Sequence, residues 1–199
     1  MLNILENEEI NTLSHNSEEY LKLLVSVMDF VYRDRAEYLG DPDFYNIPQQ
    51  LLTSKDYAKK IFNKIQKGEK PPKIKVTISE SEETTHFSII DKWGNAVSNT
   101  YTLNTAYGSG IVPTGTGILM NNEMDDFSSK PGFPNVYGLV GSEANKIEPK
   151  KTPLSSMTPV IIFKQGRPFL VSGSPGGSTI ITSVLQEVLN VLDFDMSLK

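Results

Sequence analysis

The residues best suited to chemistry in this sequence lie around Thr84, directly after an acidic run at positions 80–83. A threonine inside a chain is a poor nucleophile. If the peptide bond before it is cut, its new α-amino group can act as the base for its own hydroxyl. Thr84 is therefore a candidate nucleophile that would need cleavage of the Glu83–Thr84 bond. Taken alone, the same threonine is more simply a strand residue.

The chain also carries polar groups that such a nucleophile would need around it. They are Thr102, Asn104, the acidic cluster Asn121–Asp126, the pair Ser155 and Ser156, and the segment Gly173–Gly177. Each has a plainer interpretation as a surface strand threonine, a solvated acidic turn, a serine turn or a glycine-rich turn. The oxygen atoms at 121–126 would also suit Ca²⁺ or Mg²⁺, but the EF-hand spacing is absent.

Gly176 and Gly177 stand just before a predicted helix. Backbone N–H groups at a helix N-terminus are unpaired, and the helix dipole favours negative charge there. Glycine also lets a substrate approach the backbone closely. These properties favour an oxyanion hole. A phosphate-binding loop is less favoured, because the lysine of the GxxxxGK[ST] pattern is missing.

The composition allows one domain with a real core and excludes several functions. The chain has 199 residues and a net charge of −5, which argues weakly against nucleic acid or an anionic membrane as a partner. It has no cysteine, so a disulfide framework and any cysteine-based metal or nucleophile site are excluded. No apolar run approaches the roughly 20 residues that span a bilayer.

Periodicity predicts two helices in the first part of the chain. Asn16, with Glu19 three residues later, indicates a capped start. One face then carries Tyr20, Leu24, Val27, Met28, Val31 and Arg35. A turn at Gly40–Asp43 ends this helix, and a second one is expected from near Thr53 to just before Gly68. Residues 67–83 are typical of a linker, with a short strand at Val76 and Ile78.

The second part predicts two hairpins and a helix. Residues 85–90 and 96–103 alternate around a turn at 91–95, so pairing would bring Thr102 close to Thr84. Residues 160–163 and 169–172 form the second hairpin, after a long loop at 131–151. Ser178 then caps a helix whose buried stripe is Ile181, Val184, Leu185, Val188 and Leu192. Strands followed by helices fit a layered α+β fold.

Several motifs give the chain a specific resemblance to a known family. They are Asp34–Asp43, Thr84–His86, Gly94–Ser98, Asn121–Phe127, Pro153–Met157 and Gly173–Gly177. In order and spacing they resemble the γ-glutamyltranspeptidases, which are self-processing N-terminal-nucleophile hydrolases. The resemblance implies an α+β fold, a four-layer αββα sandwich that is incomplete in this chain. Residues 1–83 would be the C-terminal part of the large subunit, and residues 84–199 the N-terminal part of the catalytic small subunit.

The resemblance also implies roles for the candidate residues. Thr84 would attack the carbonyl of Glu83, and an N-to-O acyl shift followed by hydrolysis would leave Thr84 as a nucleophilic new N-terminus. Thr102 would orient the nucleophile, while Gly176 and Gly177 would stabilise the oxyanion. In the substrate pocket, the resemblance assigns Glu123 and Asp126 to the α-ammonium of the γ-glutamyl group. It assigns Ser155 and Ser156 to the α-carboxylate, and a hydrogen bond to the glutamyl group to Asn104. The family's carboxylate-binding arginine has no match in this chain.

The implied activity is transfer of the γ-glutamyl group of glutathione and related compounds to water, amino acids or peptides, without a metal or organic cofactor. A lid loop at 131–142, with Tyr137 over the glutamyl group, favours small substrates. The two subunits would stay associated, and the location would be periplasmic or secreted, although Met1–Glu9 lacks a signal-peptide pattern. Two alternatives stay open: a non-catalytic, unprocessed fragment, and an acylase of the same fold acting on another amide.

Overall fold

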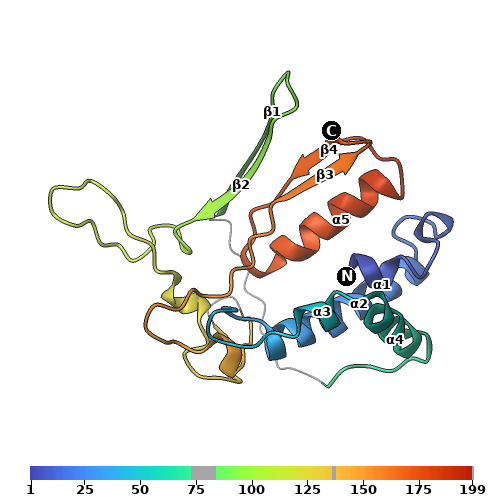
Figure 1. The fold of residues 1–199 in the computed structure, drawn as a ribbon, viewed down its shortest axis with the longest axis horizontal. Coiled ribbons are helices and arrows are strands. Elements are labelled where there is room, and N and C mark those ends of the chain that lie inside the picture. Colours follow the sequence, from blue (N-terminus) through green and yellow to red (C-terminus); the bar gives the residue numbers. More distant parts are fainter. Residues whose placement is uncertain (73–83, 136–137, 199) are drawn as a thin grey trace.

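The computed structural model describes residues 1–72, 84–135 and 138–198 (Figure 1). The predicted strand at Val76 and Ile78 lies outside this range, and so do Glu83 and Tyr137. Among the described residues, no helix is long and apolar enough to cross a membrane.

The longest element is helix α2 (Glu18–Tyr38), which begins one residue later than expected. Its N-cap is Ser17, whose Oγ accepts the N–H of Tyr20 at 3.2 Å. The prediction of Asn16 as the cap is wrong, because the Asn16 backbone adopts a left-handed conformation with φ of 58°. An N-cap residue needs an extended backbone to aim its side chain at the first turn, and Ser17 has that conformation.

The other helices of the first part are short except for α4. They are α1 (Leu2–Leu5), the 3-10 turn η1 (Ile10–Thr12), α3 (Gln49–Leu52) and α4 (Lys55–Gln66). Helix α4 has Ser54 as its N-cap, and a left-handed Gly68 with φ of 73° lies just beyond its end, as expected. Helices α1, η1 and α3 were not predicted, because three or four residues show no periodicity.

Two antiparallel hairpins follow. Strands β1 (Thr84–Ile90) and β2 (Ala96–Thr102) pair so that Thr84 lies opposite Thr102, which confirms the predicted hairpin. Strands β3 (Val160–Lys164) and β4 (Arg167–Ser172) are joined by Gln165 and Gly166, both with positive φ. The Ser98 hydroxyl donates to the Ser172 carbonyl at 2.8 Å and links the two hairpins.

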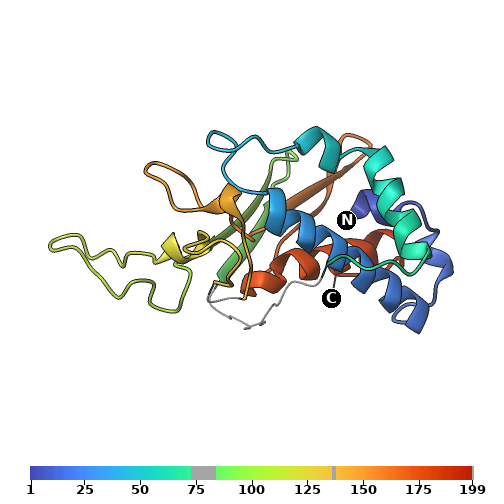
Figure 2. The ribbon, with the colours of Figure 1, turned by 90° about the horizontal axis from the view of Figure 1, so that it is seen from below.

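Helix α5 (Ile180–Leu192) lies between the first helices and the hairpins (Figures 1 and 2). Leu185 and Leu189 join the core of α1, α2 and α4, and Val184 and Val188 pack on β3 and β4. The predicted stripe is partly wrong, since Ile180 and Leu189 are buried and Leu192 is exposed. Ser178 is not the cap: it lies inside the 3-10 turn η4 (Gly177–Thr179), and Thr179 stands at the N-cap of α5.

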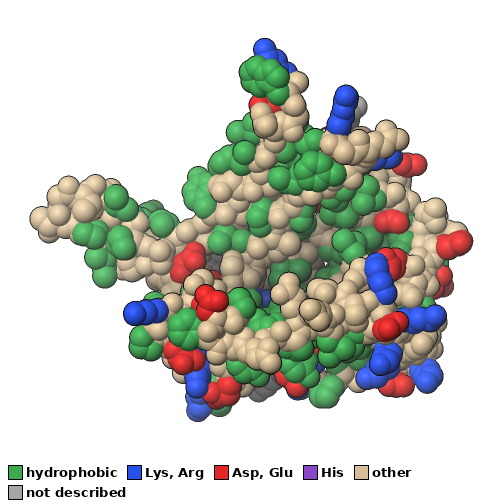
Figure 3. Space-filling model, in the orientation of Figure 1, with side chains coloured by type: hydrophobic (Ala, Val, Ile, Leu, Met, Phe, Trp, Pro, Cys, Tyr) green, Lys and Arg blue, Asp and Glu red, His purple; other side chains and the backbone are tan. Residues whose placement is uncertain are grey.

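The described residues therefore form a mixed α/β arrangement with two separate two-stranded sheets. Apolar side chains gather over the hairpins on the face shown in Figure 3. The exposed apolar residues of the four strands include Phe87, Ile89, Val97 and Phe163. Among the described residues of the loop predicted at 131–151, the structure shows the 3-10 turn η3 (Glu143–Asn145) and two isolated bridges, Pro134 with Val140 and Lys146 with Ser128.

Candidate active site

One cavity brings together residues that are far apart in the sequence. Its lining consists of Thr84, Thr102, Asn104, Asp126, Ser155, Ser156, Met157, Gly177 and Ile180. Every one of these except Met157 and Ile180 was singled out from the sequence. Strand ends, a 3-10 turn, a loop and the start of a helix thus meet at one place.

Thr84 and Thr102 enter the cavity from the open end of the first hairpin. Thr84 is the first residue of β1, is only 9% exposed, and is the cross-strand partner of Thr102 at the end of β2. The Oγ of Thr102 accepts the N–H of Asn104 at 2.9 Å. The hairpin register therefore places two hydroxyl-bearing side chains beside each other at the cavity.

Asn104 is held in an unusual conformation just beyond β2. Its φ is 79°, and its side chain is 4% exposed. Its Nδ2 donates to the carbonyl of Asn122 at 3.2 Å, and the N–H of Asn122 donates to the carbonyl of Leu103 at 3.2 Å. These bonds fix the acidic turn η2 (Glu123–Asp126) against the end of the hairpin.

The carboxylate of Asp126 is the strongly perturbed group of the cavity. Burial raises its pKa to about 6, with smaller contributions from the negative charges of Glu123 and Asp125, and the charge of Arg35 opposes the rise. Burial also raises the pKa of Glu123, which lies in the same turn but does not line the cavity. Two partly desolvated carboxyl groups next to each other suit a bound cation.

Ser155 and Ser156 form another part of the cavity lining, the serine wall, and each hydroxyl oxygen already accepts a hydrogen bond. Ser155 Oγ accepts the N–H of Met157 at 3.0 Å, and Ser156 Oγ accepts from Nη2 of Arg35 at 3.0 Å. A hydroxyl that accepts from such donors keeps its own proton to donate elsewhere. The pair therefore suits an anion.

The glycine pair lies at the turn that leads into α5. Gly176 has φ of 128° and Gly177 has φ of 54°, so both adopt backbone conformations that side chains rarely tolerate. A Cβ on Gly176 would lie 2.8 Å from Oγ1 of Thr179. Gly177 lines the cavity, and Gly176 is adjacent to it at the N-cap of η4.

Two residues of α2, Tyr32 and Arg35, were not predicted as site residues. Arg35 was placed on one helix face and in the Asp34–Asp43 motif without a role in the site, yet it contacts Ser156. Tyr32, one turn earlier, donates its hydroxyl to the carbonyl of Ser178 at 2.7 Å. The sequence did carry a signal for Arg35, which is a cation on a helix face of otherwise apolar residues. A cation at such a buried position needs polar partners, and these could belong to a site.

Asn145 was also not predicted. It links the serine wall to the turn that carries Asp126, which we call the carboxylate wall. Its Nδ2 donates to the carbonyl of Asp126 at 2.7 Å, and its Oδ1 accepts the N–H of Leu154 at 3.0 Å. Its side chain is 4% exposed. One amide thus fixes the separation between the carboxylate wall and the serine wall.

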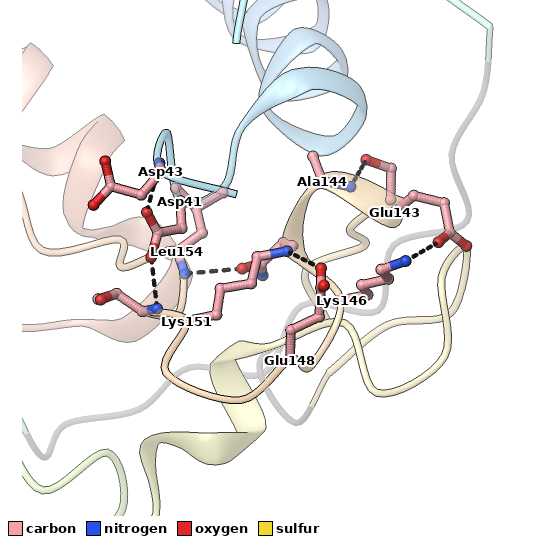
Figure 4. Close-up of polar contacts among 11 residues, drawn as sticks. Asp41, Asp43, Glu143, Ala144, Lys146, Glu148, Lys151 and Leu154 are labelled. Carbon is pink, nitrogen blue, oxygen red and sulfur yellow. Dashed lines mark hydrogen bonds and ion pairs between the residues drawn. The ribbon is translucent and has the colours of Figure 1, made fainter. Parts of the chain in front are cut away.

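The loop before Leu154 is anchored by further polar contacts (Figure 4). Lys151 lies 3.2 Å from Glu148, and the N–H of Thr152 donates to a carboxylate oxygen of Asp41 at 2.8 Å. Hydrogen bonds from backbone N–H groups lower the pKa of Asp41. The Gly40–Asp43 turn therefore supports the serine wall in addition to ending α2.

His86, two residues after Thr84 on β1, is not among the residues that line the cavity. His86 contacts the hydroxyls of Thr100 and Ser88 at 2.7 and 2.9 Å. A Cβ on Gly173 would lie 2.4 Å from the His86 ring. In the part of the chain that the structure describes, no group of three or more His, Cys, Asp or Glu side chains could hold a metal ion.

Comparison with known proteins identifies the family. The chain matches the γ-glutamyltranspeptidase family over residues 1–199, and it belongs to that family. The glutathione hydrolase proenzyme of Escherichia coli (strain K12) is 51% identical over 202 residues, covering 99% of this chain and 35% of that protein. An acylase ACY 1 proenzyme of Pseudomonas sp. (strain SE83) is 34% identical over 200 residues, covering 100% of this chain and 34% of that protein. The chain thus spans about a third of the length of these relatives.

A solved structure gives the same assignment. A γ-glutamyltranspeptidase mutant from Helicobacter pylori matches with a TM-score of 0.56 and 61% sequence identity. The match covers 58% of this chain and 62% of that chain.

Proposed function

We propose that the complete protein is a self-processing γ-glutamyl acyltransferase and hydrolase that acts on glutathione and related γ-glutamyl compounds. The observation that carries this proposal is the single cavity that joins Thr84 to a perturbed carboxylate and a serine pair. The name of the Escherichia coli relative, a glutathione hydrolase proenzyme, agrees with both the substrate and a processing step.

Maturation begins at the Glu83–Thr84 bond. Oγ of Thr84 attacks the carbonyl of Glu83, the acyl group shifts from nitrogen to oxygen, and water hydrolyses the ester. Thr84 is left with a free α-amino group, whose reference pKa near ~8 allows it to accept a proton close to neutral pH. Residues 1–83 then belong to the large subunit and residues 84–199 to the small subunit, with a four-layer αββα sandwich in the complete protein. The exposed apolar side chains over the hairpins support such an additional layer.

In the reaction, the α-amino group takes the proton of the Thr84 hydroxyl as Oγ attacks the γ-amide carbonyl. Thr102 orients Oγ, and N–H groups of Gly176 and Gly177 stabilise the oxyanion of the tetrahedral intermediate. The intermediate collapses, the amine leaves with the transferred proton, and a γ-glutamyl ester remains on Thr84. Water or the amine of an amino acid or peptide then takes the acyl group, and none of these steps needs a metal or organic cofactor.

The α-carbon end of the substrate is recognised by charge. Glu123 and Asp126 pair with the ammonium, Asn104 bonds to the glutamyl group, and Ser155 and Ser156 donate to the carboxylate. Tyr137 covers the bound group as part of a lid. We place the protein in the periplasm or outside the cell, on the family resemblance.

The test is amide hydrolysis by the complete protein with γ-glutamyl-p-nitroanilide. Thr84→Ala should remove activity, Thr84→Ser should keep part of it because the hydroxyl is retained, and Thr85→Ala serves as the control on the exposed face of β1. Loss with Thr85→Ala equal to that with Thr84→Ala would contradict the proposal.

An acylase acting on another amide is the second candidate, favoured by the likeness to the Pseudomonas acylase proenzyme. Glutaryl-p-nitroanilide, which lacks the α-ammonium, separates the two functions. Faster hydrolysis of the glutaryl compound than of the γ-glutamyl compound would support the acylase. Absence of both activities in an uncut protein would support a non-catalytic chain.

A further inference from the structure

Arg35 is a buried cation behind the serine wall. It lies in the last turn of α2, is 9% exposed, and does not itself line the cavity. Burial lowers the pKa of its guanidinium group, and the nearby Tyr32 and Asp126 oppose this. Among the described residues, no carboxylate lies within ion-pair distance of Arg35. A desolvated positive charge without such a partner is stabilised when an anion binds nearby.

All the hydrogen bonds of the Arg35 side chain in the described residues go to one short segment. Its Nη2 donates to Ser156 Oγ at 3.0 Å, and it makes longer contacts of 3.4 and 3.5 Å with the carbonyl oxygens of Ser155 and Leu154. These contacts fix both the backbone and one hydroxyl of the serine wall.

The direction of the bond to Ser156 matters for the chemistry. An arginine has donors and no acceptor, so Ser156 Oγ must accept and its proton is left to point elsewhere. Ser156 lines the cavity, so that proton is available to a group bound there. A donor polarised by a cation also forms a stronger hydrogen bond with a carboxylate.

We propose that Arg35 is a positioning residue for recognition of the substrate α-carboxylate, acting through Ser156 and the backbone of Ser155. This inference rests on the proposed function. It assigns a role in the small-subunit pocket to a residue from the segment before the cleavage site.

The experiment compares two substrates in the complete protein. γ-Glutamyl-p-nitroanilide carries the α-carboxylate, and 4-aminobutanoyl-p-nitroanilide is the same compound without it. The ratio of their kcat/KM values is independent of the fraction of active enzyme, so partial misfolding of a variant cancels. Arg35→Met should lower this ratio by about tenfold or more, since hydrogen bonds to charged groups are lost. Arg35→Lys should give an intermediate ratio.

Arg33→Met is the matched control, because Arg33 lies on the same helix and pairs with Glu37 at 3.1 Å. It should leave the ratio unchanged. In a Ser156→Ala background, Arg35→Met should lower the ratio much less than in the wild type, because the route through the Ser156 hydroxyl is already removed.

Equal losses on both substrates for Arg35→Met and Arg35→Lys, up to complete loss, would overturn the inference and make Arg35 purely structural. Full additivity with Ser156→Ala would overturn it too. A wild-type protein that cleaves neither substrate would instead overturn the proposed function, and this role with it.

Discussion

At the scale of single residues, burial of Asp126 makes its ionised form costly, and the ammonium of the proposed substrate would offset this cost. Its pKa of about 6 in the folded protein lies above the ordinary value of 3.8. A carboxyl group with a raised folded pKa contributes stability at pH values below 3.8, and this contribution is lost as the pH rises through about 6. At neutral pH the ionised carboxylate therefore destabilises the free protein, and a bound ammonium would offset that cost.

This leads to a prediction about pH. The ratio of kcat/KM for γ-glutamyl-p-nitroanilide to that for glutaryl-p-nitroanilide should fall by roughly tenfold between pH 8 and pH 5, because protonated Asp126 cannot pair with an ammonium. Titration of the Thr84 amine affects both substrates and cancels. Asp126→Asn should give a low ratio that has lost most of its change with pH. Asp125→Asn should keep the change in the ratio, moved slightly to lower pH, because the charge of Asp125 contributes to the raised pKa of Asp126. A pH-independent ratio in the wild type would exclude Asp126 from ammonium binding.

At the scale of elements, Asn145 in η3 links the carboxylate wall to the serine wall through two hydrogen bonds. Asn145→Ala would leave the N–H of Leu154 and the carbonyl of Asp126 without this partner. In an uncleaved Thr84→Ala background, we expect a loss of about 1–3 kcal/mol in the free energy of unfolding, measured by denaturant titration. With Thr84 intact, the KM for γ-glutamyl-p-nitroanilide should rise.

The control is Asn190→Ala. Asn190 lies on α5, and the substitution removes an exposed contact with His15. It should change the free energy of unfolding by less than about 0.5 kcal/mol. A similar small change for Asn145→Ala would show that its two hydrogen bonds do not hold the walls together.

The elements differ in how far they could be predicted. Strand alternation and the turn at 91–95 were sufficient for the hairpin, and with it for the pairing of Thr84 and Thr102. The start of α2 was missed because Asn16 and Ser17 are both good capping residues, and only the backbone conformation distinguishes them. Asn145 lies in an irregular loop, where no period indicates which side chain turns inward.

The partners of Arg35 could not be predicted, because they are determined by tertiary contacts. Helical spacing placed it correctly on the buried face of α2, but its partners lie about 120 positions further along the chain. The nearby Gly40–Asp43 turn was expected only to end the helix, whereas Asp41 also accepts from Thr152.

At the scale of the whole molecule, the segments before and after the proposed cleavage site share one core. Leu185 and Leu189 of α5 pack with residues of α1, α2 and α4, so cleavage would leave a large apolar contact between the two products. Tyr32 and Arg35 add polar contacts from the first segment to Ser178 and Ser156 in the second. Cutting the chain should therefore free the Thr84 amine without separating the parts.

The measurement that tests this account most directly is the intact mass of the complete protein, purified and then incubated near neutral pH. We predict two chains that meet at Glu83–Thr84 and elute together in gel filtration, and a single uncut chain for Thr84→Ala. A wild-type protein that stays whole, or a Thr84→Ala variant that is cut at the same bond, would contradict the assignment of Thr84 as the nucleophile.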